Sequence, residues 1–511
     1  MTPEQALHDV FGYPSFRPGQ KEVISAALAG RDCVAVMSTG AGKSLTYQIP
    51  ARVLGKTVLV VSPLISLMKD QVDAAASVGL RATFLNSSLA PDERRSRVEG
   101  LRRGDYELVY AAPEGLEAGA GAALAGAKLS LVAVDEAHCI SQWGHDFRPA
   151  YRNLKGLKER FQAPVLALTA TATPQVTNDI VEQLAMEDPL RVRGSFFRPN
   201  LRLSAYLKTG ERAAPRPGAV GDTKNSVLRL VRARAGESGI VYCLSRRSVE
   251  SMAEFLSGRG VKALAYHAGM DAAQREFVQD SFKRDQADVI VATVAFGMGI
   301  DKPDVRFVIH RDMPRSVEAY VQEAGRAGRD GAPSDCVAFY SWADVIGYER
   351  MTGDLPSTLA EWHRGRAREM FRTLERRACR HQALARHLGE EIAECSASCD
   401  VCAGLDPVGT SPVVPMKRFQ AGDRAMARGS ASSSESVREA ASPLFTRLRA
   451  LRKSLADARR VPAYMVFNDA TLMAMCAQLP KNEEEMRAVS GVGPKKWSEY
   501  GEIFLSALRE G

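Results

Sequence analysis

The chain has 511 residues, 45% of them hydrophobic, and carries a formal net charge of +8 at pH 7. This length exceeds what one hydrophobic core supports, so three or four domains are expected. No apolar run reaches the roughly 18 residues of a membrane-spanning helix, and the opening stretch MTPEQALHDVFGYP lacks the apolar core of a secretory signal. The sequence therefore favours a cytoplasmic protein with no membrane partner, while its mild positive charge is compatible with a polyanionic partner.

Three side chains suited to a purine ring precede the first helical pattern. Tyr13, Arg17 and Gln20 lie in the stretch FGYPSFRPGQKEVI, in which a helix is expected to start at Gln20 or Lys21. An aromatic face, a guanidinium and a carboxamide supply the stacking and the donor–acceptor pair that adenine recognition requires. On these residues alone, an ordinary helix start is the simpler interpretation.

A glycine-rich loop follows the first apolar strand, expected at Cys33–Met37. Glycine lets the backbone wrap so that amide groups point at phosphate oxygens, with Lys43 at the β- and γ-phosphates and Ser44 on Mg²⁺. Met37 stands where the general pattern has its first glycine, but the strand, loop and helix context restores the match. The nucleotide-binding candidates are Thr39, Gly40, Ala41, Gly42, Lys43 and Ser44.

Apolar runs then alternate with helical patterns, which predicts an α/β fold with a parallel sheet covered by helices on both faces. Asp135 and Glu136 close one such run, and parallel sheets bind ligands at the carboxyl ends of their strands. Asp135 could therefore share a Mg²⁺ with Ser44, and Glu136 could activate a water against the γ-phosphate. The expected strands are 58–62, 108–111, 131–134 and 165–168.

An aromatic and basic cluster follows the acidic pair directly. Trp143, His145, Phe147 and Arg148 lie on an expected loop, where they could stack on bases and contact phosphates. By themselves, these four residues equally fit a surface loop with a partly buried tryptophan.

The alternation of strands and helices restarts after a Pro/Gly-rich connection at Lys208–Lys224 and predicts a second open parallel sheet, with strands at Ala263–His267 and Val289–Thr293. Arg326 and Arg329 follow beside glycines, so a second lobe could press them against a triphosphate held by the first. Taken alone, two arginines favour a solvated basic helix end.

Four cysteines cluster in one stretch, with fifteen, three and two residues between them. Four thiolates so close in a cytoplasmic protein predict a tetrahedral structural zinc site rather than disulfides. The helical pattern RHQALARHLGEEIAE would bring its ends back to the metal, and His381 and His387 are expected to be exposed on it, because four sulfurs fill the zinc shell. The predicted zinc ligands are Cys379, Cys395, Cys399 and Cys402.

Taken as a set, the motifs resemble those of the superfamily 2 helicases, and QWGHDFRP after DEAH resembles the RecQ family of DNA helicases. The resemblance covers residues from about 5 to 405 and from about 442 to the end. The motifs are FRPGQ (16–20), TGAGKS (39–44), SPLISLMKDQ (62–71), DEAH (135–138), TATAT (169–173), GMGIDKPDVRFVIH (297–310) and QEAGRAGRDG (322–331).

The resemblance implies two RecA-like lobes that hydrolyse ATP with Mg²⁺, move 3′ to 5′ on single-stranded DNA and unwind duplexes, and a zinc module behind them. Ser38 and Ala41 stand where the family often has Pro and Gly, and the second and third cysteines usually have two residues between them rather than three. None of these departures is expected to abolish nucleotide or metal binding. The residues matched to family roles are Tyr13, Arg17 and Gln20 for adenine, Lys43, Ser44, Asp135 and Glu136 for phosphate, metal and water, Gln322, Arg326 and Arg329 for ATP sensing and the arginine finger, and Trp143, His145, Phe147 and Arg148 for the DNA-coupling loop.

Many relatives continue with a winged-helix domain, but here Asp406–Ala441 has the composition of a flexible linker, with too few apolar residues to bury a core. The winged helix, with its duplex-recognising surface and strand-separating hairpin, is therefore expected to be absent. The predicted domains are residues 1–205 and 206–341 for the two lobes, 342–405 for the zinc module, 406–441 for the linker and 442–511 for the last domain.

A helix is expected to open at Pro443, capped by Ser442, and the sequence from there resembles the HRDC domain, a small helical DNA-binding module. Tyr464 and Lys495 are its main candidates for DNA contact. The resemblance implies single-stranded and tailed duplex DNA and a single-strand DNA-binding protein as partners. It also implies a monomer of the bacterial cytoplasm and nucleoid that acts in recombination, repair, replication and the SOS response. An RNA helicase or translocase, and an annealing or junction-binding factor with regulatory ATP use, remain as alternatives.

Overall fold

The computed structural model describes residues 1–63, 65–87, 89–116, 121–124, 126–142, 144, 146–209, 218–297, 302–353, 355–409, 443–459 and 461–509. They form two compact units: Met1–Phe196 with Pro480–Arg509, and Phe197–Gly297 with Asp301–Leu479. Among the described helices, none is both long and apolar enough to cross a membrane.

The first unit is built on a seven-stranded sheet in the order β3-β4-β2-β5-β6-β1-β7, in which every neighbouring pair is parallel. The strands between the two edge strands β3 and β7 bury nearly all their residues and are therefore continuous apolar runs, whereas β7 buries none of its four residues. The strands are β1 Cys33–Val36, β2 Thr57–Val61, β3 Ala82–Leu85, β4 Leu108–Ala111, β5 Leu129–Val134, β6 Val165–Thr169 and β7 Leu190–Arg193.

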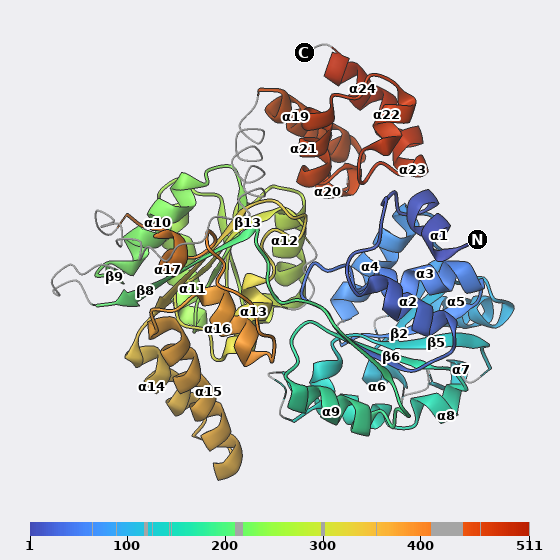
Figure 1. The fold of residues 1–511 in the computed structure, drawn as a ribbon, viewed down its shortest axis with the longest axis horizontal. Coiled ribbons are helices and arrows are strands. Elements are labelled where there is room, and N and C mark those ends of the chain that lie inside the picture. Colours follow the sequence, from blue (N-terminus) through green and yellow to red (C-terminus); the bar gives the residue numbers. More distant parts are fainter. Residues whose placement is uncertain are drawn as a thin grey trace, which may run out of the picture. The chain divides into compact units, whose positions relative to one another are not determined.

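Helices cover both faces of this sheet, with α2 and α3 on one side and α6, α8 and α9 on the other (Figure 1). Buried side chains of α2, α3 and α4, such as Val23, Tyr47 and Met68, pack with strand residues in one apolar core. The bounds are α1 Pro3–Asp9, α2 Gln20–Leu28, α3 Leu45–Leu54, α4 Ile65–Ser77, α5 Pro91–Arg103, α6 Pro113–Gly115, α7 Gly121–Leu124, η2 Ala137–Ile140, η3 Pro149–Leu154, α8 Leu157–Phe161 and α9 Pro174–Gln183.

The second unit contains a parallel sheet of the same kind, in the order β11-β12-β10-β13-β14-β8-β9. Because β8 pairs with β14 along its whole length, this sheet includes residues before position 205, the expected end of the first lobe. The strands are β8 Leu201–Lys208, β9 Ala219–Val220, β10 Ser238–Tyr242, β11 Ala263–Tyr266, β12 Val289–Ala292, β13 Val305–His310 and β14 Ser334–Tyr340.

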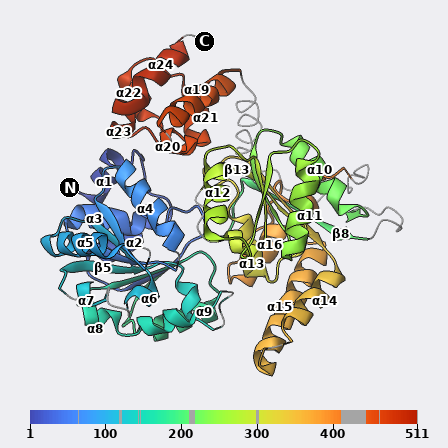
Figure 2. The same ribbon diagram turned by 180° about the vertical axis from the view of Figure 1, so that it is seen from behind.

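Helices α10 and α11 bury an apolar face against this second sheet through Val227, Leu228, Met252 and Leu256. The reverse view shows α10 and α11 together with α12 and α13 around the strands (Figure 2). The bounds are α10 Thr223–Ala233, α11 Arg246–Ser257, α12 Ala272–Lys283, η4 Val294–Gly297 and α13 Val317–Ala324.

The cysteine-rich stretch is helical and packs on the second sheet. Helices α14 (Trp342–Met351) and α15 (Ser357–Glu375) lie side by side, followed by α16 (Arg380–His387) and α17 (Asp400–Ala403). The Ala205 amide of β8 donates to the Asp400 carboxylate at 3.1 Å, which ties this module to the sheet edge.

Two expectations for this module are wrong. The helix after Cys379 ends at His387 rather than extending through RHQALARHLGEEIAE, and neither histidine on it is exposed. His381 is 5% exposed because it packs into the β8 edge, where its Nε2 lies 3.1 Å from the Leu201 carbonyl oxygen. The His387 side chain is 16% exposed because acidic side chains of α13 and α15 cover it.

The C-terminal residues form the short helices expected of an HRDC-like module. The expected helix start at Pro443 is confirmed, whereas Ser442 and most of the expected linker lie outside the described residues. The bounds are α19 Pro443–Arg459, α20 Ala463–Val466, α21 Asp469–Gln478, α22 Glu483–Ala488, α23 Pro494–Lys496, η5 Trp497–Gly501 and α24 Glu502–Arg509.

Candidate functional site

The glycine-rich loop leaves β1 and wraps toward the start of α3. Gly40 and Gly42 have φ angles of +84° and +78°, a region that favours glycine, and Ala41 between them is not left-handed. A Cβ on Gly42 would lie 2.5 Å from Gln20 Nε2, so the loop closes too tightly for a side chain there. Lys43 Nζ donates to the Met37 carbonyl across the loop at 3.3 Å. The loop therefore forms a compact backbone cradle before a ten-residue helix, which suits an anion.

The expected adenine-reading residues are linked to this loop directly. Buried Gln20 accepts from the Arg17 amide at 2.8 Å and donates to the carbonyls of Ala41 and Gly42 at 3.0 and 3.1 Å. The Arg17 guanidinium hydrogen-bonds the Gly40 carbonyl. Tyr13 is half-buried nearby, against the apolar cluster of α1 to α3. The fold therefore brings the two predicted nucleotide-binding segments together.

The acidic pair lies at the end of β5, and the sheet order places β5, β6 and β1 next to one another. Asp135 and Glu136 are therefore on the sheet edge where the glycine-rich loop begins. Glu136 has a φ of +48°, a left-handed conformation that is uncommon outside glycine. Its amide donates to the Asp135 carboxylate at 2.9 Å, and the Tyr151 hydroxyl donates to the Asp135 carbonyl at 2.9 Å.

A buried histidine connects the acidic pair to the next strand, a contact that residue types alone did not predict. His138 Nδ1 lies 2.9 Å from Thr169 Oγ1 at the end of β6 and 3.3 Å from Glu136 Oε2. His138 belongs to the DEAH motif and Thr169 to the TATAT motif, and nothing else in the sequence pointed to their contact.

The aromatic loop after DEAH is fastened at its base. Arg148 donates its amide to the Cys139 carbonyl at 2.9 Å and its guanidinium to the Pro63 carbonyl at 3.0 Å, and it lies 3.3 Å from the Asp146 carboxylate. Arg148 therefore holds the loop to its own lobe. Phe147 is 36% exposed, with the Arg152 guanidinium 5.1 Å from its ring centroid. Trp143 and His145 lie outside the described residues.

In the second unit, the expected ATP-sensing residues lie on and after α13. Gln322 is half-buried on the helix, Arg326 is buried and Arg329 is half-buried in the turn that follows. This turn includes Gly328, whose φ of +52° and close neighbours leave no room for a Cβ.

Two residues that were not predicted hold this arginine-bearing turn. Arg198 donates to the carbonyls of Gly325 and Ala327 at 2.8 and 2.9 Å, and Asn200 Nδ2 donates to those of Gly328 and Ala332 at 2.9 and 3.1 Å. Their only sequence signal was an isolated RPN triplet before a strand.

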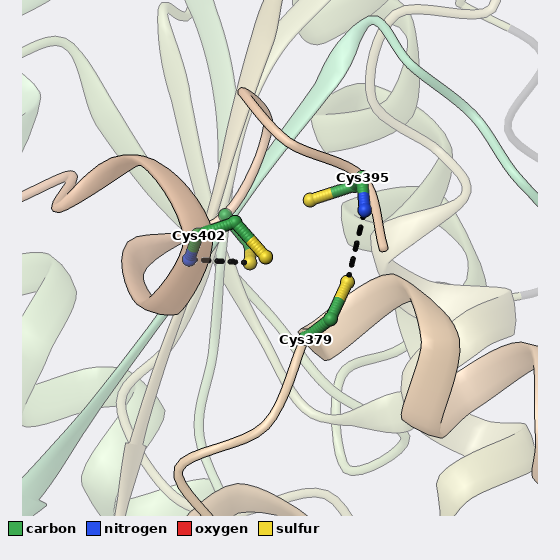
Figure 3. Close-up of side chains that lie close together, drawn as sticks. Cys379, Cys395 and Cys402 are labelled. Carbon is green, nitrogen blue, oxygen red and sulfur yellow. Dashed lines mark hydrogen bonds between the residues drawn. The ribbon is translucent and has the colours of Figure 1, made fainter. Parts of the chain in front are cut away.

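The four predicted zinc ligands converge. Their sulfur atoms all lie within 4.8 Å of one another, and in Figure 3 the labelled side chains face a common centre. Backbone amides support two of them, from Cys395 to Cys379 Sγ at 3.2 Å and from Cys402 to Cys399 Sγ at 3.4 Å. Burial raises the pKa of the Cys395 thiol to about 11, and a bound dication is what turns such thiols into thiolate ligands. The donor set fits tetrahedral zinc.

The extra residue between the second and third cysteines is absorbed locally. Ser396 takes a φ of +59°, and the Ala397 amide donates to the Cys395 carbonyl at 2.6 Å. His381 Nε2 lies 3.2 Å from the Ser398 carbonyl oxygen, which holds the end of the turn. The three residues between Cys395 and Cys399 therefore form a tight turn, and the cysteine cluster is compact.

The HRDC candidates for DNA contact have partners within the chain. Tyr464 is half-buried, with Lys302 Nζ 5.9 Å from its ring centroid, and Lys495 donates to the Ala76 carbonyl at 2.9 Å.

Comparison with known families matches successive parts of the chain. The DEAD/DEAH box helicase model matches residues 17–180, the helicase conserved C-terminal domain 222–331, the RecQ zinc-binding model 342–403 and the HRDC domain 442–508. Among solved structures, the helicase Lhr of Mycobacterium smegmatis, bound to single-stranded DNA and AMP-PNP, superposes with a TM-score of 0.51 at 24% identity over 67% of this chain and 49% of its own. This likeness shows the two-lobed helicase fold.

Curated relatives extend the similarity to the whole chain. The ATP-dependent DNA helicase RecQ of Haemophilus influenzae is 38% identical over all of this chain and 96% of its own length. The protein of the same name from Bacillus subtilis is 33% identical, over 99% of this chain and 98% of its own. With four domain models in this order and relatives matched from end to end, the chain belongs to the RecQ family of helicases.

Proposed function

We propose that the chain is an ATP-dependent DNA helicase that moves 3′ to 5′ on single-stranded DNA and unwinds duplexes, in recombination and repair. One observation carries the activity: the end-to-end match to proteins named ATP-dependent DNA helicase RecQ, in a chain whose nucleotide-binding segments converge. The direction and the pathway rest on the family resemblance alone.

In the first lobe, each role follows from position. The glycine-rich loop cradles the phosphates, with Lys43 neutralising charge on the β- and γ-phosphates and Tyr13, Arg17 and Gln20 receiving the adenine. Ser44 and Asp135 would hold Mg²⁺, which neutralises charge that develops on the phosphates. Glu136 orients and deprotonates the attacking water. Because Gln20 hydrogen-bonds the loop directly, occupancy at the adenine position can alter the loop itself.

DNA is proposed to act on this chemistry through the aromatic loop. Trp143, His145 and Phe147 would stack on bases, and Arg148 holds the loop base to Cys139, three residues after Glu136, and to Pro63 after β2. The contact of His138 with Thr169 and Glu136 gives the catalytic carboxylate a second link to the sheet edge. A strand bound at the loop can therefore shift the position of Glu136.

The second lobe supplies positive charge. Gln322, Arg326 and Arg329 are proposed to sense ATP and stabilise the transferring phosphoryl group, as arginine fingers do. Arg198 and Asn200 fix the turn that carries the two arginines. The four cysteines would hold one structural zinc, which would cross-link Cys379 at the start of α16 to the segment 395–402.

Strand separation is proposed to rely on the two lobes and the zinc module, with the HRDC domain, through Tyr464 and Lys495, as an auxiliary DNA contact. None of the four family models covers residues 404–441. The alignment with the H. influenzae protein runs over 609 positions against 511 residues in this chain, so that relative has segments that this chain lacks. We further propose a monomer that works beside a single-strand DNA-binding protein in the cytoplasm.

The test combines hydrolysis and unwinding. ATPase rates are measured with single-stranded DNA, duplex DNA, single-stranded RNA and no nucleic acid, together with strand displacement from duplexes carrying a 3′ or a 5′ tail. The proposal expects stimulation mainly by single-stranded DNA and displacement only from the 3′-tailed duplex. Stimulation by RNA would favour an RNA helicase, and DNA-stimulated hydrolysis without displacement would favour an annealing or junction-binding factor.

A further inference from the structure

Four charged side chains from three helices meet where the zinc module packs on α13. Glu318 of α13 is bridged by Arg366 of α15 and lies 2.9 Å from His387 Nε2 of α16. His387 Nδ1 lies 2.8 Å from the Glu369 carboxylate of α15. The side chains of Glu318, His387 and Arg366 are 7%, 16% and 13% exposed, so three of the four charges are largely removed from water, whereas Glu369 is at the surface.

The geometry requires a charged imidazole. Each ring nitrogen of His387 faces a carboxylate oxygen, so both nitrogens must carry a proton for both contacts to be favourable. The group then contains two positive and two negative charges. Burial opposes protonation, but Glu318 and Glu369 outweigh it and raise the pKa of His387 to about 9. Burial likewise opposes ionisation of Glu318, yet His387 and Arg366 hold its pKa below the usual range.

The clamped residue belongs to the helix that carries the proposed ATP-sensing residues. Glu318 lies in the first turn of α13, and Gln322 and Arg326 follow at intervals of four residues, so they continue along the same side of the helix and its extension. Six of the eight residues of α13 are buried and Glu323 near its end pairs with His310 at 2.8 Å, so the clamp on Glu318 fixes the first turn of a helix whose last turn is held by other contacts. The helix that carries His387 begins directly after Cys379, so the clamp and the zinc site lie at opposite ends of α16.

We propose that His387 and Arg366 are positioning residues for ATP hydrolysis: by clamping Glu318 they hold α13, and with it Gln322, Arg326 and Arg329, in the orientation that hydrolysis requires. This rests on the roles proposed above for those three residues. Neutral His387 would place a lone pair against a buried carboxylate, so its ion pair with Glu318 would be lost. The clamp is fully formed below the ordinary histidine pKa of about 6.5 and is lost as the pH rises through about 9.

The experiment compares His387→Gln, His387→Lys and wild type in DNA-stimulated ATP hydrolysis between about pH 7 and pH 10, with zinc content measured for each protein. Wild-type kcat should fall as the pH passes about 9. His387→Gln should lose about fivefold in kcat at neutral pH, a loss typical of residues that act through a packed network, with little change in the KM for ATP and no further fall near pH 9. Lysine, with an ordinary pKa of about 10.4, should restore activity and shift the fall in kcat to higher pH.

Arg368→Gln is the matched control, because Arg368 also lies on α15 but pairs at 2.6 Å with Glu349 of α14, away from α13. It should keep the wild-type pH profile. If kcat falls at the same high pH in wild type, His387→Gln and His387→Lys, the clamp is overturned. Should His387→Gln fail to fold or lose zinc, the comparison of His387→Lys with wild type still decides.

Arg329→Ala distinguishes failure of the clamp from failure of the proposed function on which it rests. If this variant hydrolyses ATP normally, the proposed role of the arginines fails. If it is inactive while the His387 variants behave as wild type, only the clamp fails.

Discussion

Glu136 adopts a backbone conformation that few non-glycine residues take, with a φ of +48° where β5 ends. Such a conformation costs about 1–3 kcal/mol and persists only when its surroundings determine it. Here the amide is held by the Asp135 carboxylate and the side chain lies near His138. Strain at a strand end beside the glycine-rich loop fits the proposed role of Glu136 as a carboxylate that faces a reacting group.

Glu136→Gln should therefore bind ATP with an affinity close to that of wild type while losing about 10²–10⁴-fold in DNA-stimulated kcat, the usual contribution of a general base. Glutamine preserves the size of the side chain and removes its basicity. The measurement is steady-state hydrolysis with a separate titration of nucleotide binding, and Glu159→Gln, at an exposed position of α8, is the control. A Glu136→Gln enzyme within tenfold of wild type would remove Glu136 from the base role.

At the scale of elements, the aromatic loop after β5 is proposed to join DNA binding and ATP hydrolysis in one short segment. Its base is fixed by Arg148 hydrogen bonds to Cys139 and Pro63, whereas Phe147 keeps more than a third of its surface exposed. A loop that is held at its base by Arg148 and exposes Phe147 is proposed to transmit the binding of a base to the adjoining strand end.

Phe147→Ala should leave hydrolysis without DNA and the KM for ATP unchanged, and reduce the stimulation by single-stranded DNA by about tenfold, since loss of one base–aromatic stack is worth about 1–3 kcal/mol. Trp143→Ala should behave alike. Phe277→Ala, an exposed phenylalanine on α12, serves as the control and should keep full stimulation. Wild-type stimulation in Phe147→Ala and Trp143→Ala would make the loop an ordinary surface segment.

The zinc module is also joined to the second lobe, through the Asp400 hydrogen bond to β8 and the pairing of Leu203 with Cys399. Cys395→Ser should lower the bound zinc from one per chain to none and reduce the temperature of thermal unfolding, because metal-binding free energy is also folding free energy. Metal analysis and calorimetry on the same samples measure both. Cys476→Ser, outside the cluster, should retain the zinc. Wild-type protein free of zinc after gentle purification would contradict the site.

The sequence sufficed for the five strands between the two edges of the first sheet and for β11 and β12 of the second, because strands buried on both faces appear as short apolar runs. Leu108–Ala111 was predicted to the residue, and the glycine-rich loop and acidic pair were expected on one sheet edge, where they lie. The four cysteines were also identified by spacing alone, and their convergence is confirmed.

Contacts that depend on distant partners could not be predicted in this way. His381 and His387 were expected to be exposed on a polar helix, but a carbonyl of Leu201 and the carboxylate of Glu318 satisfy them in buried positions. Arg198 is similar, because its carbonyl partners lie about 130 residues further along the chain. Hydrophobic periodicity shows which face of a helix or strand is buried against an apolar core. It does not show where a polar side chain is buried by a polar partner from a distant part of the chain.

At the scale of the molecule, the chain combines two RecA-like sheets, a zinc module and HRDC helices in fewer residues than its relatives. The H. influenzae alignment has about a hundred more positions than this chain has residues. The stretch Asp406–Ala441, most of which lies outside the described residues, has the composition of a linker. If the segment that only the relative carries is the winged helix, this chain should bind duplex DNA more weakly and keep its affinity for the single strand.

A footprint on a 3′-tailed duplex tests this directly. With a non-hydrolysable ATP analogue bound, the protein should protect the single-stranded tail and the junction and leave the duplex beyond the junction open to cleavage. The H. influenzae protein, probed on the same DNA, is the matched comparison and should protect further into the duplex. The net charge of +8 predicts that binding to the tail weakens as salt is raised, since phosphate contacts release counterions. Equal protection of the duplex by both proteins would mean that the two lobes, the zinc module and the HRDC helices supply a duplex-binding surface of their own.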